Sequence, residues 1–83
     1  MDFKEQYFDV WQEAWIFHKQ FANMDGTDKE WDAVVNVSDE IVEEYKNKPG
    51  YEFMKNLILS ILNELERVDK QRQMQEVKTN EKE

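Results

Sequence analysis

The sequence has no cysteine, one proline, two glycines and one histidine. Without cysteine it can form neither a disulfide, a thiolate nucleophile nor a cysteine-ligated zinc site. The scarcity of proline and glycine suits helices with short connections, because both residues interrupt helices. A domain of 83 residues that lacks disulfides depends on large apolar side chains or on self-association for its stability.

Basic residues are also in the minority. The chain has 11 Lys and Arg against 19 Asp and Glu, which gives a net charge of −8. Lys and Arg supply most of a protein's affinity for nucleic acids and for anionic membranes, so this balance argues against direct binding to either. No apolar run resembles a signal peptide or approaches the length that crosses a bilayer. We therefore expect a cytoplasmic protein.

The chain does contain three rows of mostly apolar residues at spacings of three and four. Such residues share one side of an α-helix, so each row predicts an amphipathic helix with one face to bury. The rows are Phe3, Tyr7, Val10, Ala14, Phe17, Phe21 and Met24; Trp31, Val34, Val35, Ser38, Ile41, Val42 and Tyr45; and Tyr51, Met54, Ile58, Ile61, Leu65 and Val68.

Capping signals mark where these helices begin and end. A short polar residue followed three positions later by Glu is typical of a capping box, and this pattern occurs at Asp2 with Glu5 and at Thr27 with Glu30. Gly26 directly precedes the second box, and glycine readily takes the left-handed conformation that ends a helix. A proline-glycine pair, Pro49 and Gly50, interrupts the chain after the row that ends at Tyr45. The predicted helices span about residues 2–24, 28–46 and 49–69.

Short connections between three helices favour antiparallel neighbours. The sequence therefore predicts an all-α fold, an antiparallel up-down-up three-helix bundle that forms one domain over residues 1–70, with Ile61 and Leu65 in its core. Residues 71–83 have two scattered aliphatic side chains among many charges of both signs. Such a segment buries too little surface to offset its ordering entropy, so we predict a flexible, disordered polar tail.

The first predicted helix carries more apolar surface than its row requires. At 100° per residue, its apolar arc covers more than half of the helix circumference. A contiguous group of exposed apolar residues marks an interface, so we predict a surface here for self-association or for a protein partner. The residues proposed for this surface are Phe8, Trp11, Trp15 and Ile16.

The outer face of the second predicted helix is a further candidate surface because it is acidic. Carboxylates four residues apart repel one another by a few tenths of a kcal/mol, which solvent or a counter-charge relieves. We interpret this face as a solvated exterior, and as a docking surface for Lys or Arg of another protein. A metal site is a weaker interpretation, because carboxylate di-metal bundles use inward-facing Glu-x-x-His motifs and the chain has none. The acids concerned are Asp32, Asp39, Glu40 and Glu43.

The usual signatures of catalysis are missing. The chain has no glycine-rich phosphate loop, no Gly-x-Ser-x-Gly and no His-Glu-x-x-His. His18 falls beside the tryptophans of the first helix with no nucleophile at a predictable spacing, so we expect its ring to pack on Trp11 or Trp15. We also expect so small a bundle to have little room for a ligand cavity. The prediction is a protein without enzyme activity, catalytic residues, metal ligands or cofactors.

Three functions are compatible with these patterns. The leading hypothesis is a small acidic interaction or accessory protein, for example a regulatory factor of a phage or mobile element, that binds a protein partner or itself. The first alternative is an inhibitor that presents carboxylates in place of phosphates to a DNA-binding protein. The second alternative is a bundle that binds a metal or a small ligand.

Overall fold

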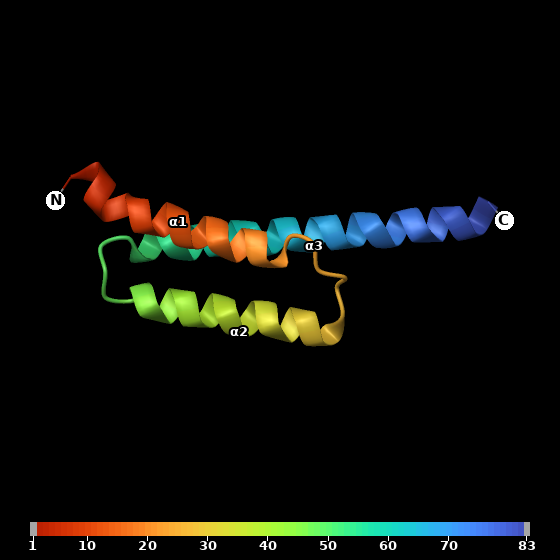
Figure 1. The fold of residues 1–83 in the computed structure, drawn as a ribbon, viewed down its shortest axis with the longest axis horizontal. Helices are drawn as coiled ribbons and strands as arrows, with labels where there is room; N and C mark the ends of the chain where they lie inside the picture. The colour runs from red at the N-terminus through yellow and green to blue at the C-terminus, as the bar shows by residue number, and fades with distance from the viewer. Residues whose placement is uncertain (1, 83) are drawn as a thin grey trace.

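The computed structural model describes the backbone of residues 2–82 and the side chains of residues 2–74. It contains three helices, α1 (Phe3–Phe21), α2 (Asp28–Tyr45) and α3 (Tyr51–Lys82). Figure 1 shows α1 and α3 running in one direction and α2 running in the other. All three pairs of helices are in contact. The predicted all-α, up-down-up three-helix bundle is confirmed.

Both predicted caps are present at the helix starts. The Asp2 carboxylate accepts a hydrogen bond from the backbone N–H of Glu5 at 2.8 Å. At the start of α2 the capping box is complete, since Thr27 Oγ1 accepts from the Glu30 N–H at 3.2 Å and the Glu30 carboxylate accepts from the Thr27 N–H at 2.9 Å. Each bond satisfies a helix-terminal N–H that has no partner within the helix.

The core lies where the three rows meet. Phe17, Met54 and Ile58 are almost completely buried, and Leu65 is buried as predicted. Ile61 packs against this core but stays partly exposed, because it faces a groove between α1 and α3. The rows therefore identify most of the core, but not all of their members are buried. Ile61 lies at the margin of the core, and Phe3 and Val35 are exposed because they lie outside the region where the three helices meet.

The connection between α1 and α2 packs against α3 through polar groups. Gly26 has φ +88°, and the buried carboxylate of Asp69 lies against its Cα. Arg72 Nη1 donates to the carbonyl oxygen of Met24 at 2.7 Å, and Gln73 Nε2 donates to Asp69 Oδ2 at 3.2 Å. These contacts come from the turn of α3 that follows the helix end predicted near residue 69, so α3 extends further than its apolar row.

The predicted division into a bundle at 1–70 and a flexible tail at 71–83 stays a prediction. Side chains beyond residue 74 lie outside the described part of the chain. Within the described part, no helix is both long enough and apolar enough to cross a membrane.

Candidate functional site

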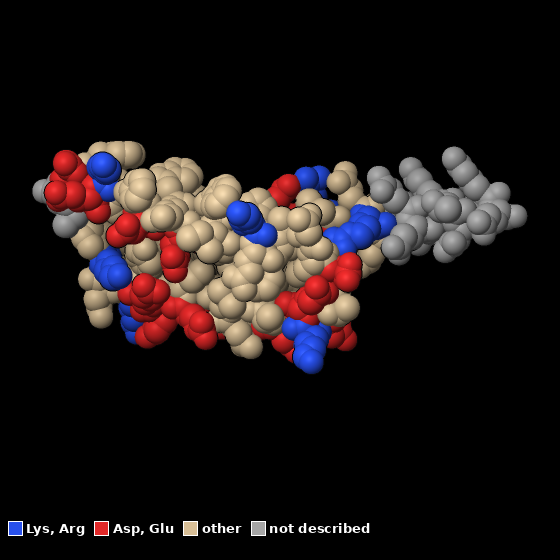
Figure 2. Space-filling model, viewed as in Figure 1, with Lys and Arg blue, Asp and Glu red and all other residues tan. Residues whose placement is uncertain are grey.

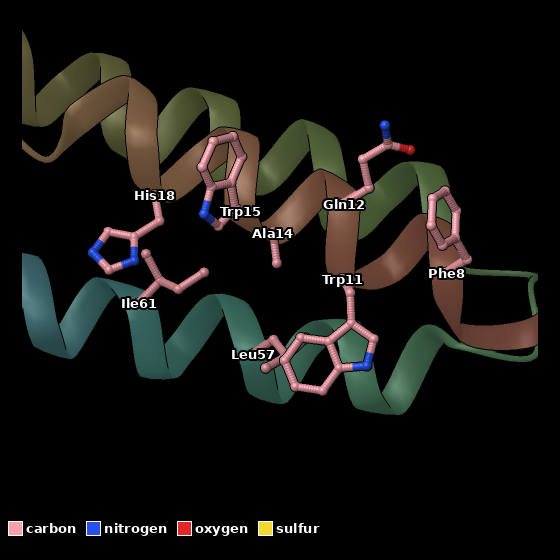
Figure 3. A pocket seen from close by; sticks show the side chains of 8 residues that line it. All are labelled: Phe8, Trp11, Gln12, Ala14, Trp15, His18, Leu57 and Ile61. Carbon is pink, nitrogen blue, oxygen red and sulfur yellow. The ribbon is translucent and has the colours of Figure 1, made fainter. Parts of the chain in front are cut away.

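A groove of about 550 Å³ lies open to solvent between α1 and α3, and we call it the aromatic groove. Figure 3 shows Trp11 and His18 directed toward α3, whereas Phe8 and Trp15 stand away from it. Leu57 belongs to the wall from α3. The lining residues are Phe8, Trp11, Gln12, Ala14, Trp15, His18, Leu57 and Ile61.

The spacing of residues along α1 explains why the rings gather here. Phe8, Trp11 and Trp15 each come directly after a residue of the first apolar row. One residue corresponds to a rotation of 100° around a helix, so these rings form an exposed line beside the buried row. The buried row fills the core, and the exposed rings have only the edge of α3 beside them.

The rings of the groove are substantially exposed. The exposed fractions are 53% for Phe8, 52% for Trp11 and 62% for Trp15. Lys19 Nζ lies 4.9 Å from the centre of the Trp15 ring, and Lys4 Nζ lies 5.9 Å from the centre of the Phe8 ring. These cation–π contacts are weak at exposed sites. Lys4 and Lys19 thus each lie over a ring of this apolar surface.

Trp11 is held more firmly than Trp15. Its ring packs edge-on against Phe53 with the ring centres 5.2 Å apart, and Phe53 packs in the same way against Tyr7 at 5.3 Å. Edge-to-face packing of this kind adds about 0.5–1.5 kcal/mol per pair beyond buried area. Trp11 is therefore a preorganised wall of the groove, whereas Trp15 protrudes.

His18 lines the same groove as both tryptophans and is partly buried. Beyond it on α3, Arg67 makes a two-point ion pair with Glu64, at 2.6 and 2.9 Å. The hydrogen bond from Arg67 lowers the pKa of the Glu64 carboxyl, and nearby His18 lowers this pKa slightly further. The His18 end of the groove therefore carries charge that is already paired.

The structure separates Ile16 from the three rings with which it was grouped. Ile16 lies in a smaller groove of about 160 Å³ between α1 and α2, together with Glu13, Glu40 and Glu44. The predicted interface on the first helix is therefore two surfaces. Phe8, Trp11 and Trp15 come together, whereas Ile16 is near Glu40 from the predicted acidic face.

The remaining acids of that face, Asp32, Asp39 and Glu43, are exposed on α2. Figure 2 shows acidic side chains gathered along α2 and mostly uncharged surface over α1. Burial raises the pKa of the Tyr45 hydroxyl, and the carboxylates of Glu13 and Asp9 raise it further. Acidic side chains of α1 therefore lie near Tyr45 of α2. Asp9 also lies beside Phe8, at one end of the aromatic groove.

Sequence reasoning did not assign Leu57 or Gln12 to a site. Leu57 lies outside the apolar row of α3, and only its position beside α1 shows that it belongs to the groove. The groove has a volume of about 550 Å³ but is open to solvent, so the expectation that so small a bundle has little room for an enclosed ligand cavity stays a prediction.

The chemistry available in the aromatic groove is burial of apolar surface. Its lining is almost entirely aromatic and aliphatic, with polar side chains only from His18 and Gln12. Among the described residues, no group of three or more His, Cys, Asp or Glu is arranged to hold a metal ion.

In comparisons with known proteins, no family model, curated protein or solved structure matches the chain.

Proposed function

We propose that this chain is a small acidic interaction protein that binds an amphipathic helix of a protein partner in the aromatic groove. The observation that carries the proposal is the concentration of three half-exposed aromatic rings in one groove. Contiguous exposed apolar surface on a folded domain marks an interaction site. An open, elongated apolar groove fits the way in which many domains bind helical segments.

The dimensions of the groove favour a helix as the occupant. From Phe8 to His18 the groove follows 11 residues of α1. The ten steps between them rise about 15 Å along the helix at 1.5 Å per residue. A bound helix of roughly three turns covers that length and presents apolar residues at spacings of three and four. A small molecule would instead be enclosed on most sides, and this groove is open.

The energy available from the groove is moderate. Covering the exposed half of one ring buries about 100 Å² of apolar surface, which is worth about 2.5 kcal/mol. Three rings then provide roughly 7 kcal/mol, against association costs of at least about 4 kcal/mol. The expected complex is reversible, and its affinity depends on further contacts at the groove margins.

A photo-cross-linking residue at Gln12 tests this proposal, because Gln12 lines the groove and is exposed. The matched control carries the same group at Asn36, which is exposed on α2. We expect the Gln12 position to capture a defined polypeptide that the Asn36 position does not capture. Equal labelling from both positions, or none from Gln12, contradicts the proposal.

Two substitutions distinguish specific binding in the groove from non-specific binding by exposed apolar side chains. Trp15→Glu places a charge in the groove at a largely exposed position, so the fold is retained while capture from Gln12 is lost. Leu59→Glu is the control, since Leu59 is a comparably exposed apolar residue outside the groove. Loss of capture in both variants would show that the groove is not responsible.

The acidic face of α2 supports a second candidate function, the mimicry of nucleic acid. Its carboxylates are exposed and gather on one side of the molecule (Figure 2). The test is competition with DNA for a basic DNA-binding protein, using the triple reversal of Asp39, Glu40 and Glu43 to Lys. Mimicry predicts that the wild type displaces DNA and the triple variant does not. Equal displacement by both proteins rejects it.

A further inference from the structure

The exposed side of α1 carries a regular heptad row, which we call the second row. Its spacing alternates between four and three residues, as at the a and d positions of a coiled coil. Every member is partly or fully exposed. The second row consists of Lys4, Phe8, Trp11, Trp15, His18 and Ala22. Phe8, Trp11 and Trp15 are the large apolar members of this row. The core is built on the buried row of α1, and α3 touches the second row only at its edge, where Trp11 packs against Phe53.

We propose that the helix bound in the aromatic groove is α1 of a second copy of this chain, aligned antiparallel to the first. The inference rests on the proposed function and names its partner. Antiparallel coiled coils place a positions opposite d positions. One register pairs all six members of the second row, with Trp11 opposite Trp15 of the second copy, Phe8 opposite His18, and Lys4 opposite Ala22. Two-fold symmetry repeats each pair.

The charges beside the second row support this partner and this direction. Glu5, Gln12 and Lys19 are seven residues apart, lie along one edge of the row and are exposed. In an antiparallel pair these edges face each other, so Glu5 of each copy meets Lys19 of the other, and Gln12 meets Gln12 at the two-fold axis. Along this edge the side-chain charge is negative at Glu5, zero at Gln12 and positive at Lys19. Two copies of the edge therefore bring opposite charges together only when the helices are antiparallel. Parallel pairing brings this edge against Tyr7, Ala14 and Phe21 instead.

The same register also places a lysine near the C-terminal end of each α1. Lys4 lies beside Ala22 of the second copy, just past the C-terminal end of that copy's helix at Phe21. The last carbonyl groups of a helix have no partner within the helix and attract cations. Lys4, whose contact in the single chain is the exposed Phe8 ring, gains this interaction in the dimer.

The surface available sets the strength of the association. Three half-exposed rings in each copy give roughly 600 Å² of aromatic surface across the dimer. Specific interfaces start near about 1,200 Å², so the margins of the groove, including Leu57, Ile61 and the lysine stems, must supply the other half. None of the acids of the predicted acidic face, Asp32, Asp39, Glu40 and Glu43, lines the aromatic groove. The inferred dimer therefore forms reversibly in a concentration-dependent manner.

Sedimentation of the purified full chain over a concentration series tests the inference. We expect the mass to rise from 10.1 kDa toward twice that value. Glu5→Lys and Lys19→Glu should each weaken the dimer roughly 10-fold, because each creates two like-charge contacts. The double variant should recover wild-type association. Matched changes of net charge at Glu43→Lys and Lys29→Glu, both exposed on α2, should have no comparable effect.

Because the chain has no cysteine, a single introduced thiol tests the register directly. Gln12→Cys should form a covalent dimer under mild oxidation, and Asn36→Cys should not. A chain that stays monomeric at every concentration overturns the inference, as does a dimer in which the charge reversals do not compensate. If the chain is monomeric while a different polypeptide cross-links at Gln12, the proposed function stands and the second copy is not the partner. If neither occurs, both fall.

Discussion

Replacing Gly26 with alanine should destabilise the bundle, because two separate features of this position exclude a side chain. Its φ of +88° lies in the left-handed region that residues with a Cβ atom adopt at a cost. An added Cβ would also collide with the carboxylate of Asp69, which is 8% exposed and accepts a hydrogen bond from Gln73. Moving the carboxylate away disturbs this bond and its ion pair with Arg72, whose Nη2 lies 3.9 Å from Asp69 Oδ1.

The two effects have similar sizes. The left-handed conformation costs alanine about 1–2 kcal/mol relative to glycine. Displacing the buried Asp69 carboxylate from its hydrogen bond costs about 1–2 kcal/mol more. The expected loss is therefore about 2–4 kcal/mol, which is most of the ~3–5 kcal/mol that a domain of this size has. The wild-type protein should be folded at room temperature, whereas Gly26→Ala should be partly unfolded.

Urea unfolding followed by tryptophan fluorescence measures this loss, and a double-mutant cycle with Asp69→Ala divides it. Removing the carboxylate removes the collision but leaves the backbone strain, so Gly26→Ala should cost less in the Asp69→Ala background than in the wild type. The reasoning is refuted if Gly26→Ala unfolds at the same urea concentration as the wild type. If the losses of unfolding free energy caused by Gly26→Ala and Asp69→Ala simply add, the collision with Asp69 is refuted, whereas the cost of the backbone conformation is not.

Three further outcomes are expected. Leu65→Ala should cost about 2–5 kcal/mol in urea unfolding, because Leu65 is buried in the core. Arg72→Ala should cost about 1 kcal/mol by losing its bond to the Met24 carbonyl, and Arg72→Lys should recover part of it. The hydrogen bond from the Thr27 N–H lowers the pKa of Glu30 below its ordinary value of 4.5. A lowered folded-state pKa stabilises the fold above pH 4.5, and this contribution is lost as the pH falls through the folded-state pKa. Melting temperatures between about pH 3 and 6 should therefore fall more steeply for the wild type than for Glu30→Gln.

The sequence predicts the elements of this fold because their determinants are local. The capping box at Thr27 and Glu30 spans four residues, and the rows that contain Phe17 and Leu65 repeat every three or four. Each is visible without knowledge of the tertiary structure. The surplus of rings at Trp11 and Trp15 is equally local, so the exposed part of α1 could be identified before its surroundings were known.

The remaining features depend on contacts between residues far apart in the chain. Leu57 joins the groove because of the rotation of α3 relative to α1, which no local pattern specifies. Ile16 lies outside the apolar arc, on the side of α1 that faces α2, so α1 borders two separate grooves. The extension of α3 is stabilised by Arg72 on the Met24 carbonyl, a polar contact across 48 positions. An apolar row cannot reveal that contact.

Acrylamide quenching of tryptophan fluorescence over a range of protein concentrations tests the central claim most directly. A Trp31→Phe background leaves Trp11 and Trp15, the two rings of the groove, as the reporters. If a second α1 covers these rings, quenching should decrease as the concentration rises, and Glu5→Lys should shift this decrease to higher concentration. Quenching that is strong and independent of concentration in both proteins would contradict the account.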